Sequence, residues 1–190
     1  MTPDLLRALD LAERLGNLAQ ARLKAVGARR GLQPAHLRIL LYLAAANRYS
    51  NTPQAVADYL GLTKGTVSQS LILLETKGLV ERGADPRDRR VVRLTLTPLG
   101  KTLVEPARRE GAERWGAAAG ALPEGLLEGL TEMLRHLQLL EVRRSFGVCR
   151  TCRHHVTEGP GPGRWRCGLT GEPLSGEDRE CICREHEAAA

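Results

Sequence analysis

The pattern that decides the fold lies in residues 62–100, LTKGTVSQSLILLETKGLVERGADPRDRRVVRLTLTPLG. In its first half the apolar residues recur at helical spacing, and in its second half they alternate with polar ones. Thr63 and Gly78 are typical helix caps and predict a helix between them. Two short strands, LVERG and VVRLTLT, follow and are joined by the charged loop ADPRDRR. The stretch therefore predicts a helix followed by a two-stranded hairpin.

The residues just before this stretch complete a helix-turn-helix. Thr52 and Pro53 predict a helix start, because Thr is a good N-cap and Pro is tolerated at the first helical position. Gly61 predicts the turn, and Ala57 is small where the two helices would cross. Four apolar residues at helical spacing predict one buried face: Leu60, Val67, Leu71 and Leu74.

The N-terminal half of the second of these helices carries short polar side chains. Such side chains can reach phosphates and base edges in the major groove of double-stranded DNA, and Gln can pair with adenine. A merely solvated helix face is the alternative for this segment alone. The residues of this helix that we predict to contact DNA are Thr63, Lys64, Thr66, Ser68, Gln69 and Ser70.

The hairpin loop is strongly basic. Arg87, Arg89 and Arg90 crowd it, and Asp85 and Asp88 are placed to brace it. A thin basic hairpin can enter a minor groove, where a narrow width concentrates the negative potential. Charged turns are common on small sheets, but a helix-turn-helix followed directly by a basic wing is a much stronger indication of DNA binding.

Amphipathic helices are predicted on both sides of this unit. Residues 2–28 and 98–119 read as helices, and a last long helix starts near Pro123. Its apolar residues step by four and three, which is typical of a helix–helix seam. A helix pair within one chain is the alternative to a dimer seam. The residues of the seam are Leu126, Leu130, Met133, Leu137 and Leu140.

Charge is spread unevenly over the 190 residues, whose formal net charge is +6. Residues 1–100 hold 15 Lys and Arg against 8 Asp and Glu, so the positive excess lies where the wing is predicted. A polyanionic partner suits such a segment. No apolar run approaches the length of a membrane span, and the N-terminus lacks the pattern of a signal peptide. We therefore expect a cytoplasmic protein with no membrane partner.

All five cysteines lie in the tail of residues 147–190, which is rich in Gly and Pro and shows no periodicity. This clustering indicates metal or redox chemistry rather than scattered disulfides. Cys149 and Cys152 have the spacing of a metal knuckle, and Cys167 follows after 14 residues. We predict Cys183, at the start of a helical turn, as the fourth ligand, with Cys181 as the alternative.

The chemistry of the cysteine cluster stays open between three alternatives. Zinc is the first candidate, since tetrahedral thiolate sites hold small core-poor modules together, although the tail lacks a second C-x2-C knuckle. An iron–sulfur cluster is the second, held by four cysteines. Free thiols that form reversible disulfides are the third. Four arginines could offset a negative four-thiolate centre: Arg150, Arg153, Arg166 and Arg184.

Residues 62–100 closely resemble the multiple-antibiotic-resistance regulator (MarR) family of winged helix-turn-helix proteins. The resemblance extends at the level of element order over residues 5–146. It implies an obligate homodimer with intertwined first and last helices, two recognition helices on a palindromic operator, and repression as the output. It also implies that Arg87 or Arg89 contacts the minor groove while Asp85 or Asp88 orients it. Many relatives bind a small-molecule effector.

The predicted fold is mainly α with a small β wing, a winged helix-turn-helix with terminal dimerisation helices and a small Cys-rich metal-binding tail. The predicted segments are 1–33 for the N-terminal dimerisation helix, 34–97 for the DNA-binding domain, 98–146 for the C-terminal dimerisation helices and 147–190 for the tail. We expect a DNA-binding transcriptional regulator, located on operator DNA in the nucleoid, with the tail as a metal or redox sensor. A winged-helix protein-interaction module with a structural zinc site is the alternative. No catalytic motif appears, so a metalloenzyme is disfavoured.

Overall fold

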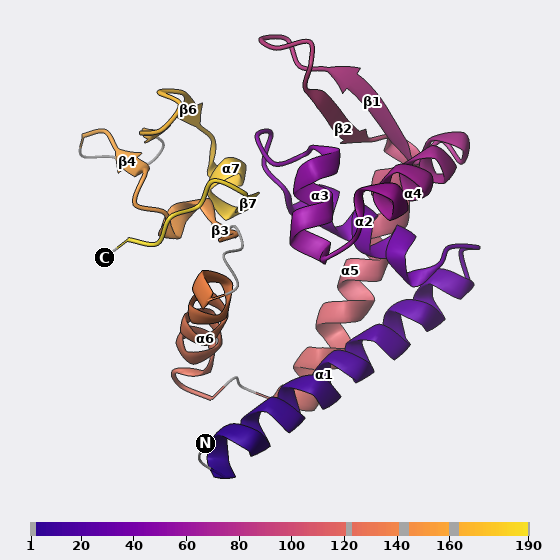
Figure 1. Ribbon diagram of the computed structural model, residues 1–190, viewed down its shortest axis with the longest axis vertical. Helices are drawn as coiled ribbons and strands as arrows, with labels where there is room; N and C mark the ends of the chain where they lie inside the picture. The colour runs from indigo at the N-terminus through magenta and orange to yellow at the C-terminus, as the bar shows by residue number, and fades with distance from the viewer. Residues whose placement is uncertain (1–2, 121–122, 141–144, 160–163, 190) are drawn as a thin grey trace.

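The computed structural model describes residues 3–120, 123–140, 145–159 and 164–189. The described part is mainly helical, with a two-stranded wing and a small β-containing C-terminal module (Figure 1). The predicted fold class is confirmed for the helices and the wing. The segment boundaries stay predictions, and residues 121–122 and 141–144 of the dimerisation segment and 160–163 of the tail lie outside the described residues.

The N-terminal part follows the predicted order of elements. Three threonines cap helices with their hydroxyls: Oγ1 of Thr52 accepts from the N–H of Ala55, that of Thr63 from Thr66, and that of Thr97 from Gly100. The elements are α1 (Pro3–Ala28), α2 (Pro34–Ala45), α3 (Pro53–Leu60), α4 (Lys64–Thr76), β1 (Val80–Ala84), β2 (Val92–Leu96), α5 (Pro98–Ala119) and α6 (Leu126–Leu140).

The turn between α3 and α4 depends on a glycine. Gly61 has φ of 63° and ψ of 33°, the left-handed conformation that residues with a Cβ rarely adopt. Its N–H donates to the carbonyl of Ala57 and so closes α3. Thr63 then caps α4 only two residues later. The short turn fixes the crossing of the two helices.

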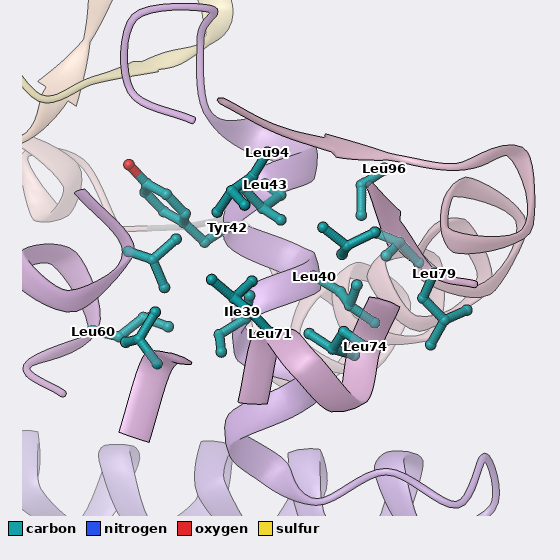
Figure 2. Close-up of a cluster of buried hydrophobic side chains, with 14 of the residues drawn as sticks. Ile39, Leu40, Tyr42, Leu43, Leu60, Leu71, Leu74, Leu79, Leu94 and Leu96 are labelled. Atoms are coloured by element: carbon teal, nitrogen blue, oxygen red, sulfur yellow. The ribbon is translucent and has the colours of Figure 1, made fainter. Parts of the chain in front are cut away.

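The core of the winged helix-turn-helix is almost wholly aliphatic (Figure 2). Leu40 of α2, Leu74 of α4 and Leu94 of β2 have no more than 1% of their surface exposed. Burying a leucine side chain stabilises the fold by about 1.5–3 kcal/mol. Figure 2 shows leucines from α2, α4 and the wing meeting between these elements. The wing is therefore fastened to the helices by its inward-facing residues.

The terminal helices leave apolar faces uncovered. Near its C-terminal end α1 packs on α2 and α5 through Val26, Leu37 and Ala107. The rest of α1 and all of α6 project away from this core, and α6 buries none of its described residues. The exposed leucines are Leu5, Leu6, Leu9, Leu11, Leu15 and Leu18 on α1, and Leu126, Leu127, Leu130, Leu134, Leu137, Leu139 and Leu140 on α6.

Residues 145–159 and 164–189 form a small unit that we call the cysteine module. Its sheets are an antiparallel β4–β5–β6 and a pair β3–β7. The elements are β3 (Gly147–Val148), a 3-10 turn η1 (Cys149–Thr151), β4 (His155–Thr157), β5 (Trp165–Cys167), β6 (Pro173–Leu174), α7 (Gly176–Glu180) and β7 (Ile182–Cys183). The helical turn predicted at Cys183 is wrong, because this residue pairs with Gly147 in a sheet.

The cysteine module packs directly on the winged helix-turn-helix. The N–H of Asn47, just after α2, donates to the carbonyl of Ile182 at 2.9 Å. The ring of Phe146 lies edge-on to Tyr59 and Tyr42, with ring centroids 5.1 and 6.4 Å away. The two units therefore share an interface between the α2–α3 loop, α3 and β7.

None of the described helices is both long and apolar enough to cross a bilayer.

Candidate nucleic-acid interface and cysteine cavity

The exposed face of α4 carries five of the six predicted contact residues of this helix. Thr63, Lys64, Thr66, Ser68 and Gln69 are exposed. The sixth residue, Ser70, was expected to be exposed, and this expectation is wrong. Only 6% of its surface is exposed, because it lies on the same side of α4 as Val67, Leu71 and Leu74 and faces the core.

The first turn of α4 is held by its own hydroxyl groups. Oγ1 of Thr63 accepts a hydrogen bond from the N–H of Thr66 at 3.1 Å. It also lies 2.9 Å from the hydroxyl oxygen of Thr66. The first-turn N–H groups and the ammonium of Lys64 give this end of the helix a positive potential. The arrangement suits an anion such as a DNA phosphate.

Asp85 organises the wing loop. Its Oδ1 accepts from the N–H groups of Arg87 and Asp88 at 2.8 and 3.1 Å, and its Oδ2 from Nε of Arg93 at 2.6 Å. These hydrogen bonds stabilise the charged carboxylate and therefore lower the pKa of Asp85. The bond from the backbone N–H of Arg87 contributes most. The loop is therefore held in one shape by a charged acceptor at neutral pH.

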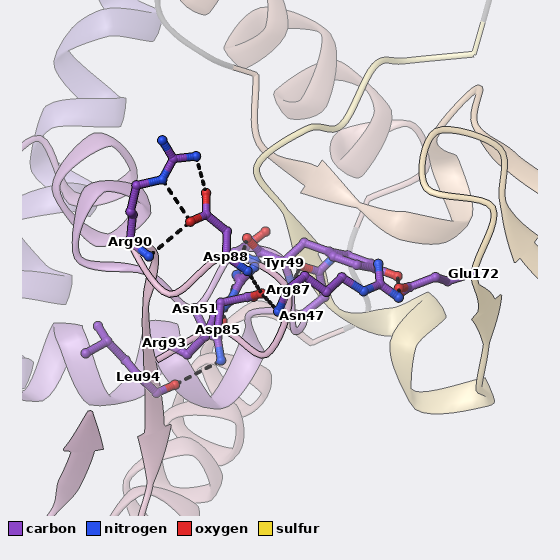
Figure 3. A network of polar contacts seen from close by, with 11 residues as sticks. Asn47, Tyr49, Asn51, Asp85, Arg87, Asp88, Arg90, Arg93, Leu94 and Glu172 are labelled. Carbon is purple, nitrogen blue, oxygen red and sulfur yellow. Dashed lines mark hydrogen bonds and ion pairs between the residues drawn. The ribbon is translucent and has the colours of Figure 1, made fainter. Parts of the chain in front are cut away.

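The three wing arginines lie in different surroundings. Arg90 forms a two-pronged ion pair with Asp88, with N–O distances of 2.9 and 3.0 Å. Its side chain is still 90% exposed. Arg89 is exposed as well. Arg87 instead points toward the cysteine module, as Figure 3 shows.

Arg93 is a part of the wing that sequence reasoning missed. Its Nη1 donates to the carbonyl of Tyr49 at 3.0 Å and to Oδ1 of Asn51 at 3.2 Å, in addition to its bond with Asp85 (Figure 3). It therefore links the wing to the α2–α3 loop. The alternation of β2 gave no sign of this role, since the partners lie more than 40 residues away.

A groove of about 460 Å³ separates α3 and α4 from the wing. Besides Lys64 and Arg90, it is lined by two basic residues that the sequence did not place at the DNA-binding face. Arg82 of β1 pairs with Glu75 at 2.8 Å, and Arg184 of the cysteine module pairs with Asp58 at 2.8 Å. The groove thus has a basic lining contributed by the recognition helix, the wing and the module.

Glu172 of the cysteine module reaches the wing. Its carboxylate forms an ion pair with Arg87, accepts a hydrogen bond from the hydroxyl of Tyr49, and lies 3.4 Å from Nη2 of Arg48 (Figure 3). Arg48 also donates to the carbonyl of Pro173 at 2.7 Å. A residue predicted to contact DNA is therefore held by a carboxylate of the same chain.

Four of the five cysteines line one cavity of about 210 Å³ at the junction of the two units. They are the four that the sequence favoured as ligands, Cys149, Cys152, Cys167 and Cys183, and all are free thiols. Cys181 lies apart from them, where its thiol donates to the carbonyl of Glu177 at 3.2 Å. Their role as metal ligands stays a prediction.

The described residues contain no group of three or more His, Cys, Asp or Glu side chains arranged to hold a metal ion. Burial and the neighbouring thiols raise the pKa of Cys149 to about 11. The arginines that were expected to offset a four-thiolate centre are instead paired with carboxylates, those of Glu180, Glu187, Glu158 and Asp58. The described residues therefore lend no support to a single-ion site, and the four arginines neutralise carboxylates whichever metal group is considered.

Comparison with known proteins agrees with this geometry. Residues 30–91 match the profile described as MarR family. A stretch of 87 residues, 45% of this chain, is 39% identical to an uncharacterized HTH-type transcriptional regulator, YdcH, of Bacillus subtilis (strain 168). That match covers 59% of YdcH, so the chain spans little more than half the length of this curated relative.

Two solved structures share the fold. The transcriptional regulator PA3341 is 29% identical, with a TM-score of 0.61 over 70% of this chain and 98% of that one. MepR of S. aureus, solved as a complex with DNA, is 24% identical, with a TM-score of 0.58 over 70% of this chain and 94% of that one. YdcH and PA3341 are described as transcriptional regulators and neither as an enzyme. Over residues 30–91 this chain is therefore similar to the MarR family, and its winged helix-turn-helix has the fold of these regulators.

Proposed function

We propose that this chain is a sequence-specific DNA-binding transcriptional regulator. The observation that carries the proposal is the basic groove between α4 and the wing, with exposed polar residues at the start of α4 on one side and Arg90 on the other. In this proposal α4 enters a major groove and reads bases through Gln69, and Arg89 and Arg90 approach the flanking minor groove. The MepR–DNA complex supports it, since that protein has the same fold.

We propose that the regulator acts as a homodimer. The exposed leucines of α1 and α6 form apolar faces on two helices that extend beyond the core, which a second copy of the chain would cover. Two-fold symmetry would place two copies of α4 on the half-sites of a palindromic operator. Repression follows in this proposal from occupying a promoter on the chromosome in the cytoplasm.

The cysteine module is proposed to modulate this binding through metal or redox chemistry. Two contacts of the module support this proposal: Glu172 reaches the wing, and Arg184 reaches α3. A winged-helix protein-interaction module is the second candidate. The exposure of Arg89 and Arg90 favours DNA over that alternative, since a protein partner gives no reason to keep a basic wing.

The test is a fluorescence-anisotropy titration of DNA from upstream of the protein's own coding region, with a scrambled duplex for comparison. We expect tighter binding to the upstream DNA and a strong decrease of affinity with salt. Gln69→Ala should weaken specific binding by about tenfold, since a good base contact contributes roughly 1–3 kcal/mol. Ile72→Ala, an exposed change on the same helix one turn away, is the matched control.

Two outcomes would decide against the proposal. Equal affinity for both duplexes would remove sequence-specific recognition. Equal affinity of the Gln69→Ala variant and the control would remove α4 as the reading element.

For the dimer, Leu137→Glu should lower the sedimentation coefficient and the DNA affinity together, and Thr131→Glu on the same helix should leave both unchanged.

A further inference from the structure

The cavity between the four cysteines has the form of a site for a multi-atom guest. Cys149 and Cys152 come from the 3-10 turn η1 and its end, Cys167 from β5 and Cys183 from β7, so four separate chain positions surround one space. Asn47 and Tyr49 of the winged helix-turn-helix line the same space. The cavity therefore lies between the module and the DNA-binding unit.

Its size favours a cluster over a single ion. A zinc ion draws four sulfur atoms to about 2.3 Å from one point, which leaves no internal space between them. Here the four cysteines are among twelve residues that line a cavity of about 210 Å³, and no three His, Cys, Asp or Glu side chains among the described residues are arranged around a single ion. An iron–sulfur cluster takes one thiolate at each of four separate positions around its own volume.

The surroundings of the thiols also suit such a cluster. The N–H of Glu187 donates to Sγ of Cys152 at 3.4 Å. Cys183 lines the cavity together with Asn47, a residue with only 4% of its surface exposed, and with Glu185. Hydrogen bonds to ligand sulfurs and exclusion of water stabilise iron–sulfur clusters and set their potentials. The apolar part of the wall is formed by Leu169 and Leu174.

We propose that Cys149, Cys152, Cys167 and Cys183 bind an iron–sulfur cluster in this cavity. The cluster enters preformed by ligand exchange. Four thiols each form one iron–sulfur bond, and their four protons pass to solvent. The iron–thiolate bonds to the carrier break, and the carrier thiolates take up protons, so no electrons are transferred. Cys181 takes no part.

The cluster has a direct structural route to the wing, and this consequence rests on the proposed function. The N–H of Cys167 donates to the carbonyl of Glu172 at 2.9 Å, and the N–H of Gly171 donates back to the carbonyl of Cys167 at 2.7 Å. A ligand at Cys167 thus fixes the turn that carries Glu172. The carboxylate of Glu172 then holds Arg87 and competes with DNA phosphate for it. The cluster-bound chain binds DNA more weakly than the cluster-free chain.

The site is tested on the full chain purified without oxygen. We expect a brown protein with iron and acid-labile sulfide in equal amounts, about four of each per chain for the four-thiolate cubane. Cys167→Ser and Cys183→Ser should each lose the chromophore, and Cys181→Ser, the matched control from the same module, should keep it. A colourless protein with stoichiometric zinc would overturn the cluster. Equal loss of iron in the Cys181→Ser variant would overturn the assignment of the four ligands, and metal-free protein would overturn the site.

The route to the wing is tested by DNA titrations of the same samples. Glu172→Gln should raise the DNA affinity several-fold and steepen its salt dependence by about one phosphate contact. Cys167→Ser should have a similar effect, and should add nothing in the Glu172→Gln background. Full additivity of the two changes, or no change with either, would overturn the route. Absence of DNA binding in every sample would contradict the proposed function and leave the iron and sulfide analysis as an independent result.

Discussion

The winged helix-turn-helix and the cysteine module are stabilised in different ways. The first is built around a continuous aliphatic cluster that joins α2, α3, α4, the wing and α5. Among its described residues, the second has only a few that are buried, namely Cys149, Cys152, Leu174 and His186. Its strands are two or three residues long. A core of that size does not offset the conformational entropy of ordering such a chain segment.

The difference shows which unit depends on the other. The winged helix-turn-helix has its own aliphatic core, which stabilises it without the module. The module instead depends on its contacts with that unit, on hydrogen bonds and, in our proposal, on an iron–sulfur cluster. Small units of this kind commonly obtain stability from metal binding. The module is therefore suited to change state while the DNA-binding unit stays folded.

The largest effect is expected in the core of the winged helix-turn-helix. Leu74→Ala removes a side chain with 0% of its surface exposed, so it should lower the free energy of unfolding by about 2–5 kcal/mol. Thermal unfolding followed by circular dichroism measures it. Ile72→Ala, two residues away and 49% exposed, should change the stability by well under half of that amount. Similar losses for both would mean that the aliphatic cluster is not the stabilising element.

The second prediction concerns the module alone. Cys167→Ser should remove protection from hydrogen exchange in β4, β5 and β6, since these strands pair through the segment that carries this thiol. The amides of α4 should keep their protection, because the buried side chains of this helix belong to the aliphatic cluster formed with α2, α3, the wing and α5. Cys181→Ser should leave both unchanged. Loss of protection in α4 as well would mean that the two units unfold together.

Much of the winged helix-turn-helix could be predicted because its signals are local. Thr52 and Thr63 cap helices three residues before the amides that they bind, and Gly61 closes α3 at the predicted turn. The pattern of apolar residues also gave the buried face of α4. It failed at Ser70, since a small polar residue on the buried side of a helix looks the same in sequence as an exposed one.

The contacts between the units could not be predicted, because they depend on packing between distant residues. Arg87 and Glu172 are 85 positions apart, and neither carries a local signal of the other. Cysteine spacing did single out four residues that line one cavity, but not the strands that bring them there. Those strands are too short to give an alternating pattern, and two of them contain a proline or a glycine.

The third prediction breaks the junction between the two units. Arg184 donates through Nε and Nη2 to Oδ2 of Asp58, at 3.1 and 2.8 Å, and both side chains are largely buried. Arg184→Ala should therefore increase hydrogen exchange in the module and in residues 46–51 without lowering the melting temperature of the winged helix-turn-helix core. Arg153→Ala, which removes an exposed pair with Glu187, is the control. Equal effects of the two changes would contradict the role of Arg184 in docking.

The smallest effect is expected from pH, at the wing. Hydrogen bonds lower the pKa of Asp85 in the folded chain, so its contribution to the wing loop is complete above the ordinary carboxyl pKa of about 3.9 and is lost as the pH falls through the lower folded value. The amide shifts of Arg87 and Asp88 in NMR spectra should therefore stay constant from neutral pH to about 4 and move below it. Asp85→Asn should abolish that acid step. A step near neutral pH would contradict this account.

A hydroxyl-radical footprint on the upstream DNA shows whether a dimer reads DNA with α4 and flanks it with the wing. We expect two protected half-sites, related by two-fold symmetry and separated by a whole number of helical turns of about 10 base pairs, each with minor-groove protection beside it. A single asymmetric protected segment, or protection that persists unchanged in a Gln69→Ala, Arg89→Ala, Arg90→Ala variant, would contradict this mode of binding.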